Sequence, residues 1–195
     1  KQFFVPLLAD ENPQVAKLAV VALSELGDKS LDSDFQKYLS HNRWEVRYQI
    51  VKALGSIKSL SSVNTLIRLA EKDDNNAVRS RAILALAKIG EKTACETIFK
   101  ILDNEDQNLV VAAIKFFCES GLTDQPGLEE KLREIFLKNN WIKNYFINTF
   151  AQNKSDFLEK VLGSVIAPRQ ARYIAALKAQ TAEEKGINTE EALLL

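Results

Sequence analysis

The single histidine of the chain, His41, is the side chain best suited to acid–base chemistry at neutral pH. It stands in a short polar stretch, SHNR at 40–43, and no base or metal ligand is spaced around it. Catalysis needs a nucleophile, a base and a group that orients them. The phosphate-binding signatures GxxxxGK[ST] and GxGxxG are absent from the sequence as well. We therefore expect His41 to be a solvated turn residue, and we expect no enzyme.

Two acidic stretches, EKDD at 71–74 and DNED at 103–106, come closest to a metal site. A calcium site is the alternative interpretation, because carboxylates are calcium ligands. Each stretch directly precedes an apolar segment with helical periodicity, however, and acidic residues stabilise the first turn of a following helix. We expect capping residues here, with neither metal nor cofactor.

The two cysteines, Cys95 and Cys118, fall in consecutive predicted helices near the same end of a hairpin. Cys118 lies about half a turn from the apolar stripe of its helix, which aims the thiol away from Cys95. Two thiols are therefore expected, and a disulfide is the alternative. So few cysteines fit a reducing compartment, so we expect the cytoplasm.

Trp44 and Trp141 each begin a predicted helix at equivalent positions. Aromatic side chains are enriched in interfaces, so a binding role is one interpretation. We expect instead that each ring covers the turn before its helix.

The balance of charges and the lack of a long apolar run limit the kinds of partner that the chain could bind. Lys+Arg and Asp+Glu both number 26, so no field of one sign draws the chain to nucleic acid or to an anionic membrane. No run of about 18 apolar residues could span a bilayer, so no membrane insertion is expected. The chain begins at Lys1 and contains no methionine, so we expect a piece of a longer protein.

One apolar pattern recurs along the chain and must position all of these residues. Apolar or small residues return at i, i+4, i+7, i+8 and i+11, which is one stripe of an α-helix. The first residues of the five copies are separated by 31, 32, 31 and 33 positions, so the pattern is a repeat. The copies are Val15, Ala19, Ala22, Leu23, Leu26; Val46, Ile50, Ala53, Leu54, Ile57; Val78, Ala82, Ala85, Leu86, Ile89; Leu109, Ala113, Phe116, Phe117; and Ile142, Phe146, Thr149, Phe150.

The fifth residue after each start is β-branched and tests this register independently. A shorter apolar segment precedes each stripe, so the unit is helix A, a tight turn and helix B. The first helix A is cut short. No hairpin can bury its stripe alone, so the units must stack into an all-α solenoid. The β-branched residues are Val20, Val51, Ile83, Ile114 and Ile147, and the B helices are predicted near 13–26, 44–57, 76–89, 107–119 and 141–152.

The phrases NPQVAKLAVVALSELG from Asn12 and NNAVRSRAILALAKIG from Asn75 resemble HEAT repeats, in particular the short variety also found in phycobilisome lyases. Arg47 and Arg79 fill the arginine position of the family phrase, whereas Ala16 and Val110 replace it in the first and fourth copies. The resemblance covers residues 1–121 well and fades through 122–166.

We expect two parts, a solenoid of about five HEAT-like repeats over 1–166 and a C-terminal capping helix with a short terminal helix over 167–195. GLTDQPGLEE, residues 121–130, is the widest joint, and its glycines and proline break helix there.

The resemblance implies that the B helices line a concave groove, and the helical wheel then selects its side chains. The face is mildly basic and carries no acidic residue. Further along the same side it includes Ser24, Gly55, Ala87, Cys118 and Ala151. The predicted partner-binding residues are Lys17, Val21, Tyr48, Lys52, Ser80, Leu84, Val111, Lys115, Asn144 and Asn148.

These side chains favour a non-catalytic scaffold or adaptor that binds a segment of a protein partner, one with an acidic edge, in the groove. One alternative, suggested by the repeat variety, is a phycobilin lyase-like chaperone subunit. The other is a nucleic-acid-binding HEAT-like protein, which would need more basic and stacking side chains than three lysines and one tyrosine.

Overall fold

In the computed structural model, residues 3–150 and 156–166 are described, and every regular element in these ranges is helical. The chain divides into two compact units, 1–125 and 126–195, and the division falls within the predicted joint. The predicted terminal helices of 167–195 lie outside the described residues. No described helix is both long and apolar enough to cross a membrane.

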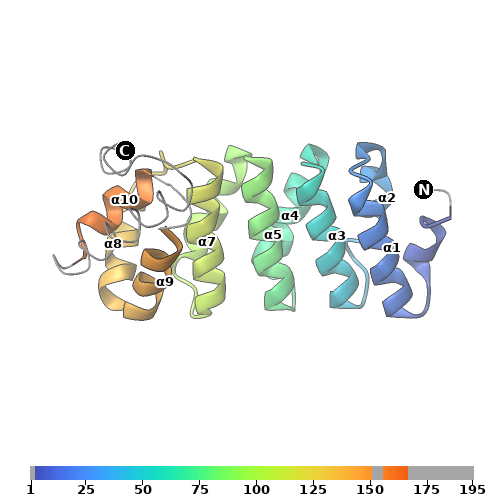
Figure 1. Ribbon diagram of the computed structural model, residues 1–195, viewed down its shortest axis with the longest axis horizontal. Helices are drawn as coiled ribbons and strands as arrows, with labels where there is room; N and C mark the ends of the chain where they lie inside the picture. The colour runs from blue at the N-terminus through green and yellow to red at the C-terminus, as the bar shows by residue number, and fades with distance from the viewer. Residues whose placement is uncertain (1–2, 151–155, 167–195) are drawn as a thin grey trace, which may run out of the picture. The chain divides into compact units, whose positions relative to one another are not determined.

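Four parallel helices form the front layer of the first unit. They are α1 (Pro13–Glu25), α3 (Trp44–Ser56), α5 (Asn76–Ile89) and α7 (Gln107–Ser120). Each packs on the next in one row (Figure 1), and we call these four the B helices. Their bounds agree with the predicted helices to within one residue. The periodicity of the sequence therefore identified them correctly.

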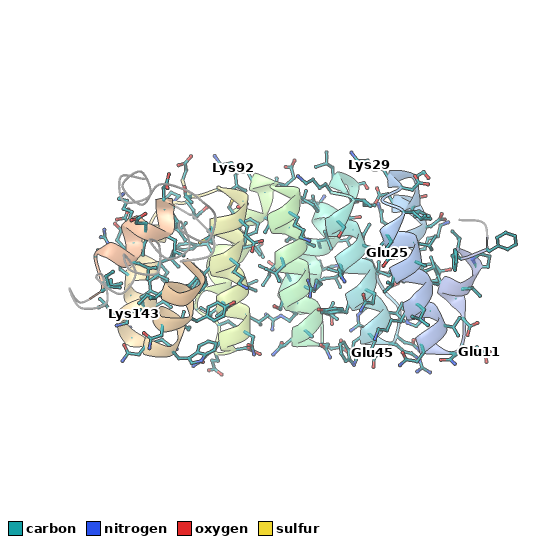
Figure 2. All side chains as sticks on the ribbon, in the orientation of Figure 1. Glu11, Glu25, Lys29, Glu45, Lys92 and Lys143 are labelled. Carbon is teal, nitrogen blue, oxygen red and sulfur yellow. The ribbon has the colours of Figure 1, made fainter. Side chains whose placement is uncertain are left out.

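The B helices all run in the same direction. Glu11 and Glu45, beside the first turns of α1 and α3, lie at the lower edge of Figure 2. Lys29 and Lys92, which follow the ends of α1 and α5, lie at its upper edge. One edge of the row thus carries every start of a B helix and the other carries every end.

A shorter A element precedes each B helix and packs against it. The A elements are η1 (Pro6–Ala9), α2 (Asp32–Gln36), α4 (Val63–Lys72) and α6 (Cys95–Ile101). Short 3-10 turns lead into the last three, namely η2 (Lys29–Leu31), η3 (Leu60–Ser62) and η4 (Lys92–Ala94). The first A element is a single turn, as expected from its short apolar segment.

The apolar stripes form the core between the two layers. The four β-branched residues of this unit, at the fifth position after each start, are all buried, so the predicted register is confirmed. One stripe residue was placed wrongly. Leu26 is 57% exposed because α1 ends at Glu25, which leaves Leu26 beyond the last helical turn.

The ends of the B helices are capped by side chains and by left-handed residues. Asn12, Asn75 and Asp106 each accept a hydrogen bond from the backbone N–H two residues later, which fixes the first turns of α1, α5 and α7. At the twelfth position after each stripe start the backbone turns left-handed, with φ between 53° and 77°. The residues there are Gly27, Lys58, Gly90 and Gly121, and Lys58 is the one non-glycine residue of the described chain with positive φ.

A buried ion pair joins the second repeat to the third. Arg47 of α3 donates two hydrogen bonds to Asp73, from Nε to Oδ2 at 2.8 Å and from Nη2 to Oδ1 at 2.7 Å. Its Nη1 also donates to the carbonyl oxygen of His41 at 2.8 Å. Burial raises the pKa of the Asp73 carboxyl, but hydrogen bonds from Arg47 and from the N–H of Asn75 lower it by more, so the net direction is downward. The arginine of the repeat phrase is therefore a structural residue.

A second polar cluster joins the same two repeats at their A elements. Asp32 of α2 accepts hydrogen bonds from the hydroxyls of Ser59, Ser61 and Ser62, at 2.5 Å in the case of Ser59. Burial raises the pKa of Asp32, and these hydrogen bonds lower it to below its ordinary value. Ser59 and Ser62 are buried, so the cluster satisfies polar groups inside the stack.

The second unit contains α8 (Leu128–Lys138), α9 (Asn140–Phe150) and α10 (Asp156–Gly163). Phe136 and Phe146 pack with ring centroids 5.8 Å apart, and α10 adds Leu158 and Val161 to the buried side chains. The prediction of α9 is confirmed. The eight-residue α10 was not predicted, because its apolar positions span only two turns.

Candidate partner-binding face

The predicted groove residues of the first unit lie on the exposed side of the B helices. Lys52 is exposed, and the other seven are half-buried. Asn144 is exposed on α9, in the second unit, whereas the side chain of Asn148 lies outside the described residues. The seven half-buried residues are Lys17, Val21, Tyr48, Ser80, Leu84, Val111 and Lys115.

Three of these residues meet in one hollow. Tyr48 comes from α3 and Ser80 and Leu84 from α5, and the hollow encloses about 340 Å³. Lys52 and Lys115 do not line it. We call it the Tyr48 hollow, and its walls are Tyr48, Asn76, Ala77, Ser80, Arg81, Leu84, Asp106 and Asn108.

Arg81 is the one cationic side chain that lines the Tyr48 hollow. Its guanidinium carbon lies 4.6 Å from the centroid of the Tyr48 ring, close enough for a cation–π interaction, and its Nη2 donates a hydrogen bond to the Tyr48 hydroxyl. The Nε atom of Arg81 is buried and has no hydrogen-bond partner. Every other buried side-chain nitrogen or oxygen among the described residues has one.

The acidic wall of the hollow is held by its own hydrogen bonds. Asp106 Oδ1 accepts from the backbone N–H of Asn108 at 2.8 Å, and Asp106 Oδ2 accepts from Asn76 Nδ2 at 2.6 Å. The side-chain oxygen of Asn76, Oδ1, in turn accepts a hydrogen bond from Arg79 Nη1 at 3.3 Å. These bonds tie the first turn of α5 to the first turn of α7 and fix the mouth of the hollow.

Sequence reasoning missed Arg81, Asn76, Asp106 and Asn108. The helical wheel selects a single row of residues along each B helix, and Arg81 follows Ser80 of that row by one position. The other three belong to the starts of α5 and α7, which reach the hollow because adjacent repeats are stacked. The signal that could have found them is the capping role of Asp106, since the cap of one repeat lies beside the first turn of the preceding B helix.

Comparison with known proteins identifies the fold. Three overlapping segments, residues 2–79, 34–117 and 63–140, match the profile of the family described as HEAT repeats. The chain belongs to the HEAT-repeat family. No curated protein matches it in sequence.

Two solved structures are similar to this HEAT-repeat chain. One is the complex of CpcE and CpcF of phycocyanin lyase from Nostoc sp. PCC7120, with a TM-score of 0.57 and 18% identity over 84% of this chain and 96% of that one. The other is an engineered protein, with a TM-score of 0.51 and 16% identity over 89% of this chain and 96% of the other. At such identities the likeness establishes the fold.

A second hollow lies at the other end of the same HEAT-repeat face. It encloses about 410 Å³ and begins one turn beyond Leu84 along α5. Gly55 and Ala87, which the wheel placed on the groove, are buried and form its floor, because α3 and α5 approach closely there. Its other walls are Ser56, Lys58, Lys88 and Glu119.

The two tryptophans are both exposed, Trp44 by 41% and Trp141 by 53%. Trp44 meets Tyr48 edge to face with ring centroids 6.5 Å apart, but it does not itself line the Tyr48 hollow. Trp141 stacks on Tyr145 at 5.9 Å in the second unit. Each tryptophan thus pairs with the tyrosine one turn later in its own helix.

His41 and the two cysteines line neither of the two hollows. His41 accepts a hydrogen bond from the backbone N–H of Arg43 through Nδ1 at 3.1 Å. Cys95 and Cys118 are not joined in a disulfide, and burial raises the pKa of the Cys95 thiol. Within the described residues, no group of three or more His, Cys, Asp or Glu side chains could hold a metal ion.

Proposed function

We propose that this HEAT-repeat chain is a binding scaffold that holds a segment of a partner protein against its B helices, with the Tyr48 hollow as the main anchor point. The observation that carries the proposal is the pairing of Tyr48 and Leu84. The stripes that build the core use neither residue, yet both line the same hollow. Aromatic and apolar side chains in such recesses act as anchors in protein interfaces.

The size of the hollow fits this use. Its volume of about 340 Å³ lies at the lower end of the range of about 300–1,000 Å³ for ligand sites. A recess of this size suits one or two side chains of a larger partner. An amphipathic helix supplies such anchors at successive turns along its apolar side.

The charges of the face favour an acidic partner segment. Lys17, Lys52, Arg81 and Lys115 follow one another across the B helices from α1 to α7. Lys17, Lys52 and Arg81 form no ion pair within the described residues. A cytoplasmic location belongs to the same proposal, supported by two cysteines that are not joined.

Capture of partners by the double variant Tyr48→Ala/Leu84→Ala tests the proposal. Partners are recovered from native lysate and quantified by mass spectrometry. We expect the double variant to lose a specific partner, because each anchor should contribute about 1 kcal/mol or more to the binding free energy. The melting temperature of the variant should be almost unchanged. The matched control Tyr38→Ala/Leu60→Ala removes the same two residue types outside the B helices and should retain that partner. Equal recovery by all three proteins would reject this face.

The two alternative functions have direct assays on the same purified protein. The similar Nostoc structure is a complex of two lyase subunits, and a pigment-handling role here would appear as phycobilin transfer to an acceptor protein. A nucleic-acid role would appear as DNA binding that weakens steeply with salt. We expect neither activity.

A further inference from the structure

The Tyr48 hollow holds more hydrogen-bond donors than acceptors that could use them. A guanidinium carries five N–H groups, and Arg81 directs one of them, from Nη2, to the Tyr48 hydroxyl. Its Nε–H is buried without a partner. Because the Tyr48 oxygen accepts from Arg81, the proton of that hydroxyl points elsewhere and is available to an incoming acceptor.

The acceptors in the wall, by contrast, are already engaged. Each carboxylate oxygen of Asp106 has a short hydrogen bond, one from the Asn108 backbone and one from the Asn76 side chain. Asp106 also forms no ion pair with Arg81, although both line the hollow. The positive charge of Arg81 therefore has no carboxylate counterpart among the described residues.

Nη1 of Arg81 also makes no hydrogen bond, and unlike Nε it is not buried, so its two N–H groups are open to an incoming acceptor. A carboxylate is the acceptor whose two oxygens match the paired N–H groups of a guanidinium. The side chain of Leu84 lines the same hollow and offers an apolar contact for the methylene groups that carry such a carboxylate.

We infer that the Tyr48 hollow recognises the side-chain carboxylate of an aspartate or glutamate in the partner segment, bound by Arg81 and the Tyr48 hydroxyl. This rests on the proposed function and names the group that the face selects. A phosphate fits less well, because its second negative charge would meet Asp106 with only one arginine to offset it. The hollow therefore discriminates by charge number as well as by sign.

The test uses a phage-displayed library of random 12-residue peptides, selected on the full chain and on its Arg81→Gln, Arg81→Lys and Arg81→Glu variants. Peptides selected on the wild type should carry an acidic residue beside an apolar one. Replacing that Glu by Gln in a synthetic peptide should weaken binding to the wild type by about 10- to 100-fold, and binding to Arg81→Gln by far less. Peptides selected on Arg81→Glu should be basic.

The outcomes separate this inference from the proposed function. If peptides need Tyr48 and Leu84 but show no acidic preference, or if Glu→Gln costs the same on Arg81→Gln, the carboxylate pocket is wrong and the scaffold stands. If no selected peptide depends on Tyr48 and Leu84, both are rejected. Arg81→Lys keeps the charge without the planar fork, so it supplies a folded comparison should Arg81→Gln lose its helical circular dichroism.

Discussion

Gly55 of α3 lies directly against Ala85 of α5, so that a methyl group on Gly55 would stand 2.8 Å from both the Cα and the Cβ of Ala85. The obstacle is backbone, which cannot rotate away as a side-chain end can. The two helices therefore approach as closely as residues without larger side chains allow. This contact sets the spacing of the second and third repeats and forms the floor of the second hollow.

Gly55→Ala should lower the free energy of unfolding by about 1–3 kcal/mol, the usual cost of overpacking. The loss should exceed the gain of about 1 kcal/mol that alanine brings to an open helix position. Urea unfolding followed by circular dichroism measures the change. The control is Gly163→Ala in α10, where an added methyl group meets nothing within 4 Å and stability should hold or rise. An unchanged midpoint for Gly55→Ala would mean that α3 and α5 are further apart.

Lys58→Gly should raise the free energy of unfolding by about 0.5–1 kcal/mol, because left-handed backbone costs a residue with a Cβ more than it costs glycine. Lys58 has φ 53° where the other three repeats of this unit have glycine. The converse change, Gly90→Ala at φ 77°, should destabilise by a similar amount. Urea midpoints of the two variants should therefore move in opposite directions. A loss of stability in Lys58→Gly would show that the lysine side chain contributes more than its backbone costs.

Arg47→Met should destabilise the chain by about 3 kcal/mol, since it leaves the buried Asp73 carboxylate without its partner. Asp74→Asn is the matched control. Asp74 also meets Arg47 but is 84% exposed, so its loss should cost less than about 1 kcal/mol. Similar losses in both variants would contradict the assignment of the pair to the core.

The same pair predicts how stability changes with acid. The pKa of Asp73 is lower in the folded protein than in the unfolded chain, so its contribution is complete above the ordinary carboxyl range, about pH 4–5. It is lost as the pH falls from there through the lowered pKa. Wild-type urea midpoints should therefore drop more steeply between pH 5 and about pH 3 than those of Asp73→Asn. Parallel curves would exclude a lowered pKa at Asp73.

The two thiols should react at different rates with Ellman's reagent. Cys118 is half-buried, whereas Cys95 is buried and burial raises the pKa of its thiol, so less of the reactive thiolate is present. We expect Cys118 to react first and Cys95 to react only as fast as the fold opens. The Cys118→Ser variant isolates the slow phase. Two equally fast thiols in the native protein would contradict the burial of Cys95.

The sequence predicted the B helices well because their signal is local. A stripe such as Val78, Ala82, Ala85 and Leu86 lies within one helix, and its period follows from helix geometry alone. The prediction that Leu26 is buried was wrong because the stripe continues past the last turn of α1. The short helix α10 was not predicted because two helical turns are too few to show a clear apolar period.

The candidate site was predicted less completely because it is made between repeats. The wheel found Tyr48 and Leu84, each of which faces away from the core of its own helix. It could not find Arg81 or Asp106, whose places in the wall depend on how α5 packs against α3 and α7. Nor could it foresee that Gly55, an open position on an isolated helix, is covered by Ala85.

The common direction of the B helices has an electrostatic consequence. Aligned peptide dipoles add, which places roughly half a positive charge at each helix start and half a negative charge at each end. Four flanking side chains have the opposite signs, with Glu11 and Glu45 at the edge of the starts and Lys29 and Lys92 at the edge of the ends. Arg43 before α3 and Glu25 and Glu119 near the ends of α1 and α7 instead have the same sign as the dipole end beside them. The side chains therefore offset only part of the backbone field, and a partner segment laid along the B helices meets a potential that changes sign from one edge of the row to the other.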